Sequence, residues 1–112
     1  MREQSRDIDR LKDILRFIDE IIAQKSQFHC GLRAENPIVY YGFVKAVEII
    51  GEAAWKLTSE FKESHKEVPW EQVAKMRHIL VHEYYRRDDE FLEFTLNNDI
   101  PEMKPFIEKY IK

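Results

Sequence analysis

The chain has 112 residues, of which 44% are hydrophobic and 35% are charged, enough for one domain with a small core. Its net charge of -3 argues against a general nucleic-acid binder, and its single cysteine, Cys30, excludes an intramolecular disulfide. The longest apolar run, residues 38–44, is far shorter than the roughly 20 residues of a membrane span, and the N-terminus lacks a signal-peptide pattern. We expect a single domain over residues 1–112, located in the cytoplasm and not attached to a membrane.

The first half of the chain predicts two long helices. Apolar residues recur at spacings of three and four over residues 5–25, and the polar segment 26–36 is expected to be a loop. A second helix over residues 38–62 is apolar around much of its circumference, which is typical of a central helix. Its two glycines, Gly42 and Gly51, predict close approach of a neighbouring helix.

The second half predicts two more long helices and a short one. Pro69 starts the third helix, which ends near residues 86–89. A short helix follows through residues 91–96, then a turn at 97–99 and a last helix from Pro101 to about residue 110. No strand pattern occurs in the sequence. The predicted fold is therefore all-α, an antiparallel bundle of four main helices plus a short extra helix.

The third predicted helix carries an unusual set of polar groups between apolar residues. Arg77, His78, His82 and Tyr84 fall within ten residues of each other, in a helix that also contains Ile79, Leu80 and Val81. His78 and His82 lie one turn apart on one face, but Arg77 and His82 differ by roughly 140° of rotation. One straight helix does not easily aim both at one atom, so we expect them to meet in a cleft between two such helices in a symmetric dimer.

The same helix is locally basic although the whole chain is acidic. Lys75, Arg77, Arg86 and Arg87 outnumber Glu83, the one acidic residue between positions 75 and 87. Such a patch can attract phosphate, with binding that weakens as salt rises. A solvated basic helix face is the alternative interpretation, and the charge pattern alone favours it.

Arg77 and His82 together suit phosphodiester chemistry. A histidine titrates near neutral pH and can move protons, while an arginine holds phosphate oxygens and stabilises developing charge. This pair could cleave RNA without a metal or another cofactor, because RNA supplies its own 2′-hydroxyl nucleophile.

A zinc site at His78 and His82 is the competing interpretation. The residue after the first histidine is Ile79, whereas the zinc peptidase helix has glutamate there. A third ligand would have to come from Glu83, His65 or His29, and nothing in the sequence supports one of them. We therefore expect no metal.

Several segments together resemble the HepT-like proteins, a family of HEPN-domain ribonucleases. The pattern Arg77-x4-His82-x-Tyr84 resembles the family signature. Further similar segments, in chain order, are Arg6-Asp7, Ile49-Ile50-Gly51-Glu52-Ala53-Ala54, Val68-Pro69-Trp70 and Ile100-Pro101-Glu102-Met103. The sequence departs from the family at His78, where asparagine is usual, and at residues 86–89, which replace an acidic pattern. Glu52 is either a polar group near the site or a surface carboxylate, and we slightly favour the surface.

The resemblance implies an HEPN-like fold and a homodimeric, metal-independent endoribonuclease toxin. Arg77 and His82 would be catalytic, with His82 as general acid or base. His78 and Tyr84 would support them, and Lys75, Arg86 and Arg87 would bind RNA. The family's usual partner is MntA, a minimal nucleotidyltransferase antitoxin that adds AMP to the motif tyrosine, here Tyr84.

Two other functional classes remain open from the sequence. The domain could be a non-catalytic helical module that binds a nucleotide, or that presents substrate to a minimal nucleotidyltransferase, with Arg77 and His82 holding phosphate without cleaving. It could also be only a dimerisation bundle. We rank the ribonuclease first, the binding module second and the structural role third.

Overall fold

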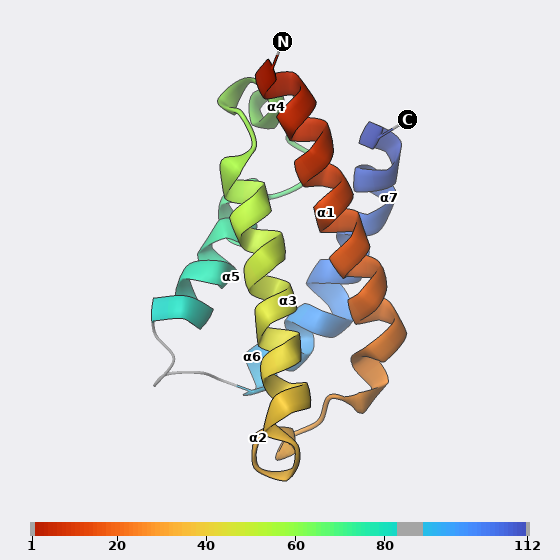
Figure 1. Cartoon of the computed structure of the whole chain (residues 1–112), viewed down its shortest axis with the longest axis vertical. Coiled ribbons are helices and arrows are strands. Elements are labelled where there is room, and N and C mark those ends of the chain that lie inside the picture. The colour runs from red at the N-terminus through yellow and green to blue at the C-terminus, as the bar shows by residue number, and fades with distance from the viewer. Residues whose placement is uncertain (1, 83–88, 112) are drawn as a thin grey trace.

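The computed structural model describes residues 2–82 and 89–111, and side chains at residues 6–79 and 89–111. All regular structure in those residues is helical, which confirms the predicted all-α class. Four long helices form the bundle, as predicted (Figure 1). They are α1 (Arg2–Gln24), α3 (Pro37–Lys56), α5 (Trp70–His82) and α7 (Ile100–Ile111).

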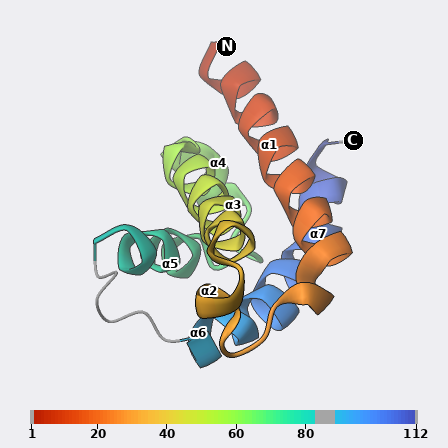
Figure 2. The same cartoon turned by 60° about the horizontal axis from the view of Figure 1, so that its bottom comes forward.

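Neighbouring helices place α5 at one side of the bundle. The helices α1 and α3 run antiparallel beside each other, and α7 packs against α1. The helix α5 packs on α3, on the side away from α1 (Figures 1 and 2). None of the described helices is both long and apolar enough to cross a bilayer.

Short elements complete the fold and correct three details of the prediction. The extra helix predicted after the third long helix is α6 (Asp89–Phe94). The expected loop over residues 26–36 contains a 3₁₀ turn (Lys25–Gln27) and the helix α2 (Leu32–Glu35). The helix expected over residues 38–62 ends at Lys56 and is followed by α4 (Ser59–Ser64). The expected turn at 97–99 belongs to a π-helical segment (Thr95–Asp99) that leads directly into α7.

Contacts from α1 explain why the second helix breaks at Leu57 and Thr58. Both residues are extended, and the Thr58 hydroxyl caps α4 by accepting the Phe61 N–H at 3.2 Å. The Thr58 N–H and hydroxyl donate to the two Asp7 carboxylate oxygens at 3.0 and 2.7 Å. Arg10, one turn further along α1, donates to the Lys56 carbonyl oxygen at 2.5 Å. The buried Asp7 therefore fixes the joint between α3 and α4.

The core lies where α1, α3 and α7 meet. It is mostly aliphatic, with fully buried Ile14 and Ile18 from α1, Val47 and Ile50 from α3 and Ile107 from α7. Burial of such side chains contributes roughly 1.5–3 kcal/mol each to folding. The buried Tyr40 hydroxyl donates to Asp89 Oδ1 at 3.2 Å, which ties α3 to the start of α6.

Candidate active site

The contact between α3 and α5 positions Arg77. Gly51 is buried in α3, and a Cβ atom placed there would overlap the Cβ atom of Arg77. The same added atom would lie 3.2 Å from the Val73 carbonyl oxygen and 3.3 Å from Arg77 Cγ. The glycine thus lets the two helices approach at Arg77, as the sequence predicted for this position. The base of the arginine side chain is held against α3, and the residue as a whole is half-buried.

The other predicted close approach, at Gly42, is wrong within the chain. Apart from the chain neighbours of Gly42 and the adjacent backbone of its own helix, no atom of the described structure lies within 4 Å of the place where a Cβ atom would stand at Gly42. Gly42 lies about two and a half turns before Gly51 in α3 and is exposed to solvent. Among the contacts that the structure describes, Gly51 and not Gly42 lies where two helices approach closely.

The described part of α5 presents basic and polar side chains beside Arg77. His78 and Lys75 are exposed on this helix. Their exposure is consistent with the predicted roles in supporting and binding a phosphate backbone, and it equally fits a solvated face. Of the predicted site residues whose side chains the structure describes, Arg77 is the one that packs against a neighbouring helix at a glycine.

Several predicted site residues lie beyond what the structure describes. The backbone of His82 belongs to α5, one turn after His78, but its side chain is outside the described set. Tyr84, Arg86 and Arg87 are outside the described residues altogether. The convergence of Arg77, His82 and Tyr84 thus stays a prediction.

Glu52, which follows Gly51 in α3, forms an ion pair within its own helix. Its carboxylate pairs with Lys56 at 3.2 Å, one turn along α3, and both side chains are about half exposed. This agrees with the expectation that Glu52 is a surface carboxylate.

The histidines considered as third zinc ligands are engaged elsewhere. The His65 ring stacks on Phe61 at 4.0 Å between ring centroids, and its Nδ1 is 2.8 Å from the Phe61 carbonyl oxygen. His29 Nε2 is 3.1 Å from a Glu35 carboxylate oxygen. Within the described residues, no three histidine, cysteine or acidic side chains are grouped as metal ligands.

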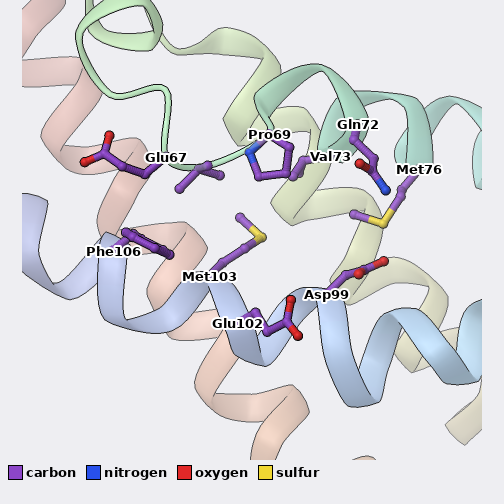
Figure 3. A pocket seen from close by; sticks show the side chains of 10 residues that line it. Glu67, Pro69, Gln72, Val73, Met76, Asp99, Glu102, Met103 and Phe106 are labelled. Atoms are coloured by element: carbon purple, nitrogen blue, oxygen red, sulfur yellow. The ribbon is translucent and has the colours of Figure 1, made fainter.

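A cavity that the sequence did not indicate lies between α5 and α7. It has a volume of about 260 Å³, and Figure 3 shows Met76 of α5 and Met103 of α7 lining it together with three carboxylate side chains. Its acidic residues are Glu67, Asp99 and Glu102, and no lysine or arginine lines it. Burial is the main cause that raises the pKa of the Asp99 carboxyl, and the nearby negative charge of Glu102 raises it further. A phosphate group would be repelled here, so this cavity is not the RNA site.

Comparison with known proteins identifies the family. The model of a family described as ribonuclease HepT-like matches residues 8–110. A protein of Thermococcus cleftensis named a probable ribonuclease HepT is 35% identical over 105 residues, covering 90% of this chain and 96% of its own.

Two further relatives carry provisional RNase names. One, from Methanocaldococcus jannaschii, is 34% identical over 91% of this chain and 84% of its own. The other, from Caldanaerobacter subterraneus, is 36% identical over 70% of each chain. No solved structure matches this chain. The chain therefore belongs to the HepT-like ribonuclease family, which confirms the resemblance and the enzyme class predicted from its sequence.

Proposed function

We propose that the chain is a cytoplasmic endoribonuclease toxin of a toxin–antitoxin pair, acting as a homodimer and without a metal ion. The observation that carries the proposal is the position of Arg77. In a chain of a ribonuclease family, a buried glycine of α3 holds the base of this arginine on the helix that also carries His82.

The proposed reaction uses the RNA's own 2′-hydroxyl group. His82 takes the proton of that hydroxyl as its oxygen attacks the adjacent phosphorus. The bond from phosphorus to the 5′-oxygen breaks, and that oxygen takes a proton from water as it leaves. The Arg77 guanidinium binds the non-bridging oxygens and stabilises the charge that develops on them. The products are a 2′,3′-cyclic phosphate and a 5′-hydroxyl end.

The remaining basic and polar residues of the motif region bind and orient the RNA. Lys75, Arg86 and Arg87 would contact backbone phosphates, and His78 would help to orient the reacting phosphate. Lys75 and His78 are exposed on α5, as such roles require.

A cleavage assay on RNA tests this mechanism. Wild-type protein should cleave with EDTA present, and His82→Ala should abolish cleavage while the circular dichroism spectrum keeps its helical form. Arg77→Lys should lose most activity, because lysine lacks the planar fork of donors. His78→Ala should reduce activity less.

Two results would contradict the mechanism. Activity that disappears with EDTA and returns with zinc would favour a metal site at His78 and His82. A wild-type protein that binds RNA or nucleotide but never cleaves would favour the non-catalytic partner of a nucleotidyltransferase.

Regulation by an MntA-like nucleotidyltransferase antitoxin is the second part of the proposal. AMP on Tyr84 would place a negative phosphate and a nucleoside beside the arginines that hold RNA, which opposes substrate binding. After incubation with the cognate enzyme and ATP, mass spectrometry should map AMP to position 84, and Tyr84→Phe should stay active. An adduct on Tyr40, Tyr41 or Tyr110 instead would rule this regulation out.

A further inference from the structure

Trp55, near the end of α3, is unusually exposed. Its side chain is 67% exposed, whereas Trp70, the other tryptophan of the chain, is 6% exposed. Trp70 is buried with its indole N–H donating to the His65 carbonyl oxygen at 2.8 Å. A large aromatic ring left in water is a common feature of binding surfaces.

An open pocket extends from Trp55 between the end of α3, the helix α4 and the start of α5. Its volume is about 660 Å³, within the usual range of small-molecule sites. Trp55 forms one wall, α4 contributes Lys62 and Glu63, and α5 contributes Glu71 and Ala74.

The charges around the pocket are mixed. Lys62 donates to the Trp55 carbonyl oxygen at 3.3 Å, which holds its ammonium group beside the end of α3. Lys66 lies 3.7 Å from Glu63, with both side chains 76% exposed, and Glu71 also lines the pocket. Two lysines and two glutamates nearly cancel, so the aromatic ring and not net charge would provide most of the binding here.

The pocket adjoins the proposed active site along the contact between α3 and α5. Trp55 follows Gly51 by one helical turn, and Ala74 precedes His78 by one turn. Gly51 in turn packs against Arg77. Trp55 and Ala74 therefore each lie about one helical turn from the contact between Gly51 and Arg77, so one RNA strand can reach both Arg77 and Trp55.

We propose that the Trp55 indole ring is a stacking platform for an unpaired nucleobase of the RNA, next to the site of cleavage. This inference rests on the proposed ribonuclease function. All four bases can stack on an aromatic side chain, so the platform favours single-stranded RNA without selecting a sequence. Lys62 contacts a phosphate of the same nucleotide or its neighbour.

Tryptophan fluorescence offers a direct test. In a His82→Ala, Trp70→Phe background, which removes cleavage and leaves Trp55 as the only tryptophan, a ten-nucleotide oligouridine should quench the emission. Trp55→Ala should weaken the binding of a labelled oligouridine roughly 5- to 150-fold. Fluorescence anisotropy of the labelled oligouridine measures this affinity. Trp55→Phe should keep most of the affinity.

Controls separate stacking from charge and from general loss of structure. Trp55→Ala should leave the salt dependence of binding unchanged. Lys62→Ala should reduce the slope of log affinity against log salt concentration by about one, which corresponds to the loss of one phosphate contact. Ile38→Ala removes a side chain that is 84% exposed at the other end of the same helix, and it should leave affinity unchanged.

Three results would overturn the platform. In the first, Trp55→Ala changes the affinity for oligouridine less than twofold. In the second, the His82→Ala protein shows no measurable binding at low salt, and in the third, Trp55→Ala loses only self-association in light scattering. The last would make the ring a protein contact. Failure of the proposed function gives a different result. If the wild-type protein never cleaves RNA but its binding of oligouridine still depends on Trp55, the ribonuclease function is wrong and the stacking platform stands.

Discussion

The packing of Gly51 against Arg77 links the stability of the bundle to the geometry of the candidate site. The atoms nearest to the glycine are the arginine Cβ and a main-chain carbonyl oxygen of α5, neither of which can swing away. Any side chain at position 51 must therefore move the whole helix that carries Arg77 and His82.

Gly51→Ala should consequently destabilise the protein and reduce cleavage. Alanine gains about 1 kcal/mol of helix propensity over glycine, but overpacking at a rigid contact costs about 1–3 kcal/mol. Because the added methyl group overlaps Arg77 itself, activity should fall even where the variant is fully folded. Chemical denaturation and the RNA cleavage assay measure the two effects.

Gly42→Ala is the matched control on the same helix. Its added methyl group meets no atom of the described structure within 4 Å, so only the gain in helix propensity remains. The free energy of unfolding should rise by about 0.5–1 kcal/mol, with cleavage unchanged. Equal behaviour of the two alanine variants would show that the contact at Gly51 is not needed.

For single residues, the sequence predicted that a glycine or an arginine matters better than it predicted which residue each one contacts. Gly42 and Gly51 look alike in sequence, and only the course of α5 decides which one is packed. Arg77 was identified from its pattern with His82, but nothing in that pattern placed its Cβ atom against Gly51. Trp55 belongs to a helix that the sequence predicts to be apolar around much of its circumference, and the pattern does not indicate that its ring is exposed.

Among the secondary-structure elements, the joint between α3 and α4 depends on a single buried carboxylate. Asp7 is 3% exposed, and its oxygens accept both donors of Thr58 while Arg10 lies 3.6 Å from one of them. A buried donor that loses its acceptor costs about 1–3 kcal/mol.

Asp7→Ala should therefore lower the free energy of unfolding by about that amount, because the Thr58 N–H and hydroxyl lose their acceptors. Asp9→Ala, an exposed aspartate on the same helix, should change stability by no more than about 0.5 kcal/mol. Thermal unfolding followed by circular dichroism compares the two variants. Equal losses would mean that the joint is fixed by apolar packing alone.

This joint also explains what sequence periodicity missed. The apolar stripe continues through Leu57 and Phe61, so periodicity predicts one helix over residues 38–62. The break arises from hydrogen bonds to Asp7, some 50 residues earlier in the chain, and no local pattern contains that information. The four long helices, in contrast, were predictable because each carries its own repeating apolar face.

For the whole molecule, the position of α5 matters most. It lies at one side of α3, away from α1, so a second copy can approach its outer face (Figure 2). The spacing of positions 77 and 82 predicts side chains roughly 140° apart around one helix axis, which favours a site built from the Arg77 of one protomer and the His82 of its partner. Light scattering at micromolar concentration should then show twice the chain mass, and a strict monomer would contradict the shared site.

Mixing two inactive variants tests the shared site directly. Arg77→Lys and His82→Ala homodimers should each be nearly inactive. After subunit exchange, half of the dimers contain one copy of each variant. One of the two clefts in such a dimer combines the intact Arg77 of one protomer with the intact His82 of the other. About a quarter of wild-type cleavage should return by this statistical count if the subunits mix freely. If each protomer carried a complete site, every cleft would keep one altered residue, and the mixture would stay as inactive as its components.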